Sequence, residues 1–184
     1  MTNLNDGTIY LRALEPDDAA ILYEWENDPS VWQYGDRRAP LSMTQLRDYA
    51  LNYDADPIRA GQLRLVVALC ATDEAVGCID LYEIDATNAR AGVGVLTEKG
   101  RRGKGYALRA LQLLCRYARV ALSLHQLWCN VSEENTASRG LFKKCGFETC
   151  GRLRSWLRRG DRYADAYFMQ RMLVREEASE RLPF

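Results

Sequence analysis

The chain has 184 residues, of which 47% are hydrophobic and 27% charged, and its 25 basic side chains balance 25 acidic ones. This length suits one domain with a sizeable core, and the zero net charge argues against a general nucleic-acid binder. No apolar run approaches the roughly 18 residues of a membrane span, and the polar N-terminus does not resemble a signal peptide. The six cysteines form no close-spaced framework and there is one histidine, so we expect no metal site and a reducing, cytoplasmic location.

The first part of the chain predicts one strand and two helices. Residues Thr8–Leu14 alternate enough to form an opening strand. A proline and two carboxylates start a helix over 15–27, which the next proline stops. A loop or short helical turn should cover 31–40. A capping-box pattern opens a second helix over 42–53, and the turn 54–57 breaks it.

The middle of the chain predicts an antiparallel meander followed by a helix. Three apolar segments, Leu63–Cys70, Ala75–Ile84 and Ala91–Leu96, are joined by short polar turns. Apolar residues then recur at helical spacing over Leu108–Ala121, so this helix should pack on the sheet. The remaining elements are a strand, a helix ended by a glycine, and a closing hairpin: Gln126–Val131, Glu134–Lys144, Phe147–Leu157 and Tyr163–Leu173.

The segment Arg101–Ala107, which lies between the third meander strand and its helix, has the composition of a phosphate-binding turn. Its glycines allow the backbone to approach phosphate oxygens. The first N–H groups of the helix have no intrahelical partner, and the helix dipole adds positive charge there. A basic, solvated turn before an amphipathic helix is the alternative, because short glycine motifs also occur by chance.

Three motifs in order resemble the GNAT N-acetyltransferase superfamily. Residues Arg102–Ala107 fit the pattern Arg/Gln-x-x-Gly-x-Gly/Ala of its acetyl-CoA loop. Asn135–Ser138 resembles its Asn-x-x-Ser helix start, and Lys144–Phe147 its Gly-Phe turn. The sequence is most similar to the branch of spermidine and ribosomal-protein-alanine N-acetyltransferases. The similarity runs from Thr8 to about Leu173.

This resemblance implies one domain over 1–173, followed by a charged tail over 174–184. The implied fold is α/β (α+β), with a mixed, mostly antiparallel central sheet and helices on both faces. In the family, the third meander strand splays from the strand bearing Asn130, and the arm of acetyl-CoA inserts between them. By resemblance, a backbone N–H near Val95 or Leu96 polarises the thioester carbonyl. The implied cofactor-binding residues are Val95, Leu96, Arg102, Gly103, Lys104, Gly105, Tyr106, Ala107 and Asn135.

The acid that protonates the departing thiolate is uncertain from the sequence. Spermidine N-acetyltransferases have a tyrosine at the position of Phe142, which has no proton to give. The ribosomal-alanine branch uses a serine at the position of Ser138, which makes Ser138 our candidate. Serine near a helix start also commonly bonds the backbone. Tyr106, Tyr167 or a water molecule could supply the proton instead.

The base that takes the amine proton is also open. Many relatives place a glutamate where this chain has Gly92. By resemblance, Glu83 matches an acid that the spermidine branch retains, and we expect it to act as base or amine anchor. A solvated carboxylate at a strand end is the competing interpretation, and Asp80 and Asp85 are the alternatives. His125 suits proton transfer, but family structures place that turn away from the thioester.

The acceptor site should involve the N-terminal helices and their loop. Trp25, Trp32 and Tyr34 could form its walls, since aromatic faces and nearby carboxylates suit a cationic amine. Core aromatics beside a solvated acidic face are the alternative. Arg37 and Arg38 stand where the spermidine branch has paired acids, which disfavours a polycation and leaves an anionic substrate part or a peptide open. The nearby carboxylates are Glu24, Glu26 and Asp28.

These features predict an enzyme that moves acetyl from acetyl-CoA directly to a primary amine. The acceptor would be a small amine, a polyamine or a protein N-terminus, and the chain could form a homo-oligomer; neither nucleic acid nor membrane is expected as a partner. Phe142 and Gly92 favour a second hypothesis, a catalytically silent acyl-CoA-binding or sensor module. A nucleotide-binding domain is disfavoured, because it would need parallel strands before the glycine loop.

Overall fold

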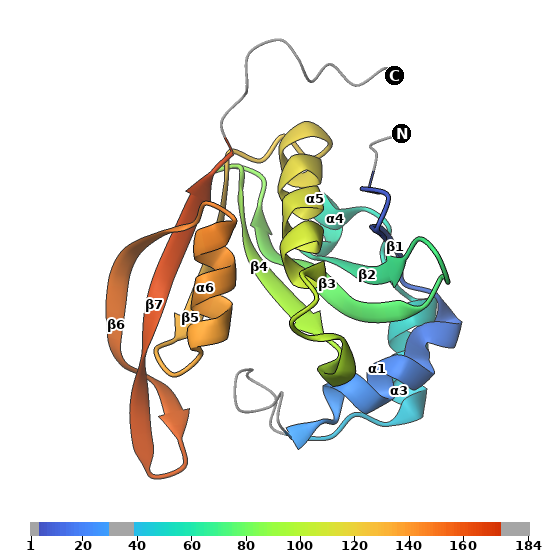
Figure 1. Ribbon diagram of the computed structural model, residues 1–184, viewed down its shortest axis with the longest axis horizontal. Helices are drawn as coiled ribbons and strands as arrows, with labels where there is room; N and C mark the ends of the chain where they lie inside the picture. Colours follow the sequence, from blue (N-terminus) through green and yellow to red (C-terminus); the bar gives the residue numbers. More distant parts are fainter. Residues whose placement is uncertain (1–3, 30–38, 174–184) are drawn as a thin grey trace.

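The computed structural model of the protein describes residues 4–29 and 39–173, and their strands form one seven-stranded sheet (Figure 1). The strand order is β1-β2-β3-β4-β5-β7-β6. Every neighbouring pair is antiparallel except β4 and β5, which are parallel. The strands are β1 (Ile9–Ala13), β2 (Leu63–Leu69), β3 (Ala75–Asp85), β4 (Arg90–Thr97), β5 (Gln126–Ser132), β6 (Glu148–Arg159) and β7 (Arg162–Met172).

The described helices cover both faces of this sheet, which confirms the fold class expected from the sequence (Figure 1). They are α1 (Ala19–Glu26), α3 (Met43–Leu51), α4 (Pro57–Ala60), α5 (Tyr106–Val120) and α6 (Thr136–Lys144), with short 3-10 turns η1 (Pro16–Asp18) and η2 (Lys99–Arg101).

Two apolar clusters form the core, one on each face of the sheet. Buried residues of α5, such as Leu111 and Leu114, pack with residues of the sheet and α6 in the larger cluster. On the other face, Leu22 of α1 and Leu46 of α3 pack on Val66 of β2 and its neighbours. Apolar side chains at helical spacing thus bury one stripe of each helix, as the sequence pattern predicts.

Two of the differences between the expected and the observed helices have identifiable reasons. Helix α5 begins at Tyr106 rather than Leu108, because Gly105 adopts a left-handed conformation (φ 83°) directly before it. Helix α4 begins at the last residue of the turn expected at 54–57 and continues over residues for which no element was expected. The carboxylate of Asp56 accepts from the N–H groups of Ile58 and Arg59, which caps this short helix.

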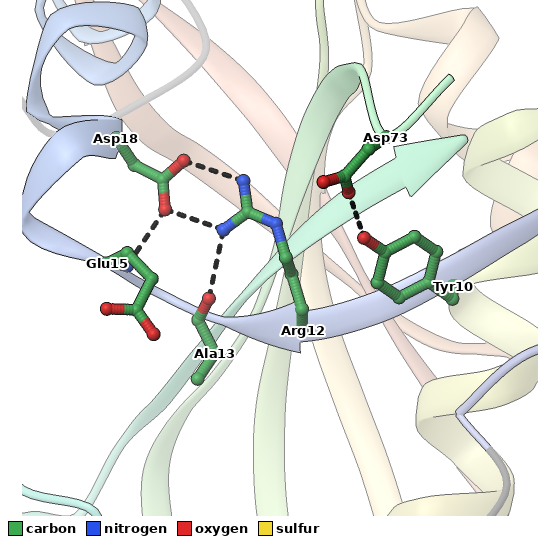
Figure 2. Close-up of polar contacts among 6 residues, drawn as sticks. All are labelled: Tyr10, Arg12, Ala13, Glu15, Asp18 and Asp73. Carbon is green, nitrogen blue, oxygen red and sulfur yellow. Dashed lines mark hydrogen bonds and ion pairs between the residues drawn. The ribbon is translucent and has the colours of Figure 1, made fainter. Parts of the chain in front are cut away.

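A polar corner fixes β1 against η1 (Figure 2). The guanidinium of Arg12 donates to both carboxylate oxygens of Asp18, each at 2.7 Å. Asp18 also accepts from the N–H of Glu15 at 2.8 Å. Burial alone would raise the pKa of Asp18, but the hydrogen bonds from Arg12 and Glu15 outweigh it and lower that pKa.

Strands β4 and β5 separate partway along their length. Their pairing runs from Arg90–Gln126 to Gly92–Trp128 and stops there. Residues Val93–Thr97 remain paired with β3 but not with β5. This separation is the splay that the family resemblance implies, and it leaves backbone groups of β4 open toward α5 and α6.

Candidate active site

A cavity of about 730 Å³ lies between the end of β4 and the N-terminal ends of α5 and α6. It brings together most of the cofactor residues expected from the sequence, from three separate segments. Lys104 is exposed on the loop and is the one expected cofactor residue outside the lining. The lining residues are Val95, Leu96, Thr97, Arg101, Arg102, Gly103, Gly105, Tyr106, Ala107, Leu108, Asn135, Thr136, Ala137, Ser138, Gly140, Leu141 and Lys144.

The glycine loop has a backbone that other residues rarely adopt. Gly103 and Gly105 have φ angles of 77° and 83°, in the left-handed region that favours glycine. A Cβ placed on either residue would have no other heavy atom within 4 Å. The glycines are therefore required by backbone conformation, and the space above them is open to a ligand.

The cavity is electropositive. Three of its lining residues, Arg101, Arg102 and Lys144, are cationic, and none of the described lining residues is acidic. Arg101 pairs with Glu74, while Arg102 donates through Nε to the carbonyl of Thr97 at 3.2 Å. The free N–H groups at the start of α5 add partial positive charge. This arrangement suits a phosphorylated ligand.

The start of α6 is capped by Asn135. Its Oδ1 accepts from the N–H of Ser138 at 3.0 Å, so this residue is the N-cap that the sequence predicts. The Ser138 side chain lines the cavity. Within residues 4–29 and 39–173, its hydroxyl has no hydrogen-bond partner. The sequence left open that the Ser138 hydroxyl bonds the backbone at the helix start. In the structure, the side chain of Asn135 makes that capping contact.

Phe142 lies in the core rather than in the cavity. Its side chain is 3% exposed, and its ring meets that of Phe147 edge-on, with centroids 5.0 Å apart. The neighbouring residue Leu141 lines the cavity instead. Of the other proton donors considered, Tyr106 lines the cavity, whereas Tyr167 packs beneath the guanidinium of Arg139.

The candidate bases lie in different environments. Glu83 is exposed at a bulge in β3, with φ 49°, and lines neither described cavity. Asp80 is held by Arg64, at 2.7 and 2.9 Å. Asp85 accepts from Asn88, which lowers its pKa and ties it to the turn before β4. His125 is exposed where the chain enters β5, and it too lines neither cavity.

The position at which many relatives carry a glutamate is filled by an aromatic ring. A Cβ on Gly92 would lie 2.3 Å from Cε2 of Tyr82, so no larger residue fits there unless Tyr82 moves. Tyr82 was not among the residues predicted from the sequence. The available signal was Gly92, which lies directly before the splay, because a glycine in a strand often marks the close approach of another group.

A second cavity, of about 180 Å³, lies beside the first. It shares Leu96, Thr97 and Arg102 with the larger cavity. Its remaining lining residues come from α1 and its C-terminal end, and from the turn after β4: Glu24, Trp25, Asp28, Glu98 and Lys99.

The expected acceptor residues divide between this cavity and other places. Trp25 is 8% exposed; its side chain packs in the core and also lines the second cavity. Glu26 was expected beside the cleft, but it is buried and its Oε1 lies 2.7 Å from Nη1 of Arg64. Trp32 and Tyr34 lie outside the described residues.

Several lining residues of α6 were not predicted from the sequence, among them Gly140 and Lys144. Gly140 stands inside the helix, where glycine costs about 0.5–1 kcal/mol relative to alanine, and it faces the cavity with open space around it. Lys144 reaches the cavity from the end of the same helix. A glycine in the middle of a helix was the available signal.

Neither a metal site nor a spanning helix is found in the described chain. Among those residues, no three His, Cys, Asp or Glu side chains are grouped to hold a metal ion. None of the described helices has both the length and the apolar character to cross a membrane. All six cysteines are free thiols.

Comparisons with known proteins agree with this geometry. The chain is 30% identical to the uncharacterized N-acetyltransferase p20 of Bacillus licheniformis, over 97% of this chain and 99% of that one. It is 30% identical to YdaF of Bacillus subtilis, named as a ribosomal N-acetyltransferase, over 81% and 82% of the two chains. The spermidine N(1)-acetyltransferase of Vibrio cholerae is 25% identical over 78% of this chain and 80% of its own length.

The fold agrees as well. A crystal structure of spermidine N-acetyltransferase from Vibrio cholerae, in complex with CoA and spermine, superimposes with a TM-score of 0.82 at 24% identity, covering 91% of this chain and 97% of that one. The family described as acetyltransferase (GNAT) domain matches residues 8–148. With the splayed strands and the electropositive cavity at the glycine loop, these matches show that the chain is an acetyl-CoA-dependent N-acetyltransferase of the GNAT family.

Proposed function

We propose that this enzyme transfers acetyl directly from acetyl-CoA to the primary amine of a small molecule or a protein N-terminus. The observation that carries the proposal is the electropositive cavity where β4 and β5 separate. Acetyl-CoA would occupy the cavity where the strands separate. The amine would reach the same point from the opposite face of the sheet. Direct transfer needs both substrates at the same place.

The residues present fit acetyl-CoA. Gly103, Gly105 and the N-terminus of α5 would hold the pyrophosphate, with Arg102 supplying charge. Asn135 would contact the pantetheine arm from the start of α6. The N–H of Val95 or Leu96 would polarise the carbonyl that receives the amine. The bound co-substrate supplies an activated acetyl thioester.

Two proton transfers accompany the reaction. We assign the proton for the departing sulfur to Ser138, because its hydroxyl lines the cavity and has no partner in the described chain. Glu83 remains our candidate for base or amine anchor. Its exposure at the bulge and its place outside both cavities mean that it would act on the amine at the entrance or through a water molecule.

The proposal also covers the cellular compartment, the acceptor class and self-assembly of the enzyme. The free thiols support a reducing compartment such as the cytoplasm. A polyamine acceptor is suggested by the Vibrio cholerae relative, and a structure of that enzyme is described as dodecameric. We therefore propose that this chain could also assemble with copies of itself.

The test combines a binding and a turnover measurement. Acetyl-CoA should bind the full chain in a calorimetric titration, and thiol release should accelerate with at least one member of a panel of small amines and N-terminal peptides. Binding without turnover on any amine would favour the silent acyl-CoA-binding module. Absence of binding would remove the proposal.

A further inference from the structure

Three aromatic side chains form a row across the sheet, outside both cavities. The rings of Tyr82 on β3 and Trp128 on β5 meet edge-on, with centroids 5.3 Å apart and planes at 83°. Trp128 stacks on Phe168 of β7 at 5.6 Å and 20°. All three side chains are partly buried and partly accessible. We call these three residues the aromatic row.

The aromatic row lies on the face of the sheet that α1 and α3 cover elsewhere. Side chains alternate along a strand, and Cys78, four positions before Tyr82, packs in the cluster under α1 and α3. Leu127 and Cys129, on either side of Trp128, pack in the cluster under α5 and α6. The row is therefore on the opposite face of the sheet from the helices that border the cofactor cavity.

The aromatic row also marks the point where the sheet opens. Tyr82 pairs in register with Gly92, and Gly92 pairs with Trp128, which is the last pair before β4 and β5 separate. Tyr82 reaches on to Gly94, where a Cβ would lie 3.9 Å from its Cε1. An acetyl group held in the separation would thus be reached from this face beside Tyr82 and Trp128.

Two carboxylates, those of Asp80 and Glu26, are held by one cation, Arg64. Asp80, two positions before Tyr82, accepts from Nε and Nη2 of Arg64 at 2.7 and 2.9 Å. The third nitrogen of the same guanidinium, Nη1, donates to Glu26 at 2.7 Å. Arg64 balances one of these two charges, so the cluster formed by the three residues offers at most one net negative charge.

We infer that the aromatic row is the acceptor wall and that it selects a primary amine carried by an aromatic or aliphatic group with a single positive charge. This inference rests on the proposed function and narrows its acceptor. Aromatic faces bury apolar surface and attract one ammonium group. A polyamine would place further ammonium groups against rings and a cluster that offers at most one net negative charge, so the hydration that those groups lose is not fully replaced.

The experiment measures amine binding to the full chain saturated with CoA. 2-Phenylethylamine should bind at least about tenfold more tightly than spermidine, because its ring buries apolar surface against the row and it has no further ammonium groups to desolvate. Trp128→Leu should weaken 2-phenylethylamine binding about tenfold. Trp156→Leu is the matched control, because Trp156 is 58% exposed on β6 and belongs to neither site, and it should bind as the unaltered chain does.

Spermidine binding equal to or tighter than 2-phenylethylamine binding would overturn the inference, as would unchanged binding in Trp128→Leu. If Trp128→Leu does not fold by circular dichroism, Phe168→Leu tests the same wall. The proposed function has a separate readout: acetyl-CoA turnover with spermidine preferred would leave it intact and remove only the acceptor wall. Acetyl-CoA binding without turnover on any amine would remove both.

Discussion

The ring of Tyr82 occupies the space that a side chain at position 92 would need, since a Cβ on Gly92 would lie 2.3 Å from Cε2 of that ring. The two residues are paired in register on β3 and β4, immediately beside the splay. The glycine that departs from the family pattern is thus explained by the ring packed against it.

This contact predicts a coupled effect on stability. Gly92→Ala should lower the free energy of unfolding by about 1–3 kcal/mol, because the added methyl displaces a packed ring. In a Tyr82→Ala background the same change should cost less, with a coupling of about 0.5–3 kcal/mol. Urea unfolding of the four proteins measures it. Equal costs in both backgrounds would show that Tyr82 does not restrict position 92.

The glycine loop predicts loss of cofactor binding in Gly105→Glu. The variant adds bulk and negative charge where the pyrophosphate should lie, so we expect acetyl-CoA binding to be abolished in calorimetry. Gly160→Glu is a matched control, because Gly160 also has a left-handed φ of 63° and open space around it, in the β6–β7 turn. Both variants carry similar backbone strain, of about 1–2 kcal/mol. Retained micromolar binding in folded Gly105→Glu would remove the assignment of the loop.

The hydroxyl of Ser138, which has no hydrogen-bond partner among the described residues, predicts a purely kinetic defect in Ser138→Ala. General acid catalysis contributes about 10²- to 10⁴-fold, so kcat should fall at least about tenfold. Acetyl-CoA affinity should stay nearly unchanged, because Asn135 rather than the serine hydroxyl caps the helix. Thr87→Ala, in an exposed turn, serves as the control. A smaller fall in kcat would point to Tyr106 or a water molecule as the acid.

The role of Glu83 is tested by the pH dependence of Glu83→Gln. An alkylamine is largely protonated at neutral pH and cannot attack until it loses a proton. If Glu83 is base or anchor, kcat/KM for the amine should fall, and activity should shift to higher pH, where free amine is more abundant. Glu148→Gln, exposed on β6, should leave the profile unchanged. An unaltered pH–rate profile in Glu83→Gln would discard the assignment.

The corner formed by Arg12 and Asp18 predicts acid-dependent stability. Asp18→Asn should lower the free energy of unfolding at pH 7 by about 1.5–3 kcal/mol, the range for hydrogen bonds to charged groups. The folded-state pKa of Asp18 lies below its ordinary value of 3.8. Its contribution is therefore complete above that pH and is lost as the pH falls through the folded-state pKa.

The unaltered chain and Asp18→Asn should accordingly converge in stability at acid pH, as thermal unfolding between pH 7 and pH 2 would measure. Asp161→Asn, in the exposed β6–β7 turn, should change little at any pH. A difference that persists undiminished at the acid end would show that the charge of Asp18 is not the source of its effect.

Most of the elements and the glycine loop could be predicted from the sequence, because both depend on local chemistry. Apolar spacing located α5, Gly103 and Gly105 marked the turn before it, and Asn135 marked the start of α6. Such signals act over a few residues, so they can be read along the chain. The expected cofactor residues that line the cavity each belong to one of these local motifs or to the strand before the loop, whereas Gly140 and Lys144 belong to none and were not predicted.

Which charges are paired and which rings meet could not be predicted in this way. Glu26 and Asp80 are far apart in sequence, yet both contact Arg64. Tyr82 fills the space at Gly92 because β3 and β4 are paired in that register, and a shift of one residue would turn the ring to the other face. Such contacts depend on strand register and helix packing, which a linear pattern of residue types does not specify.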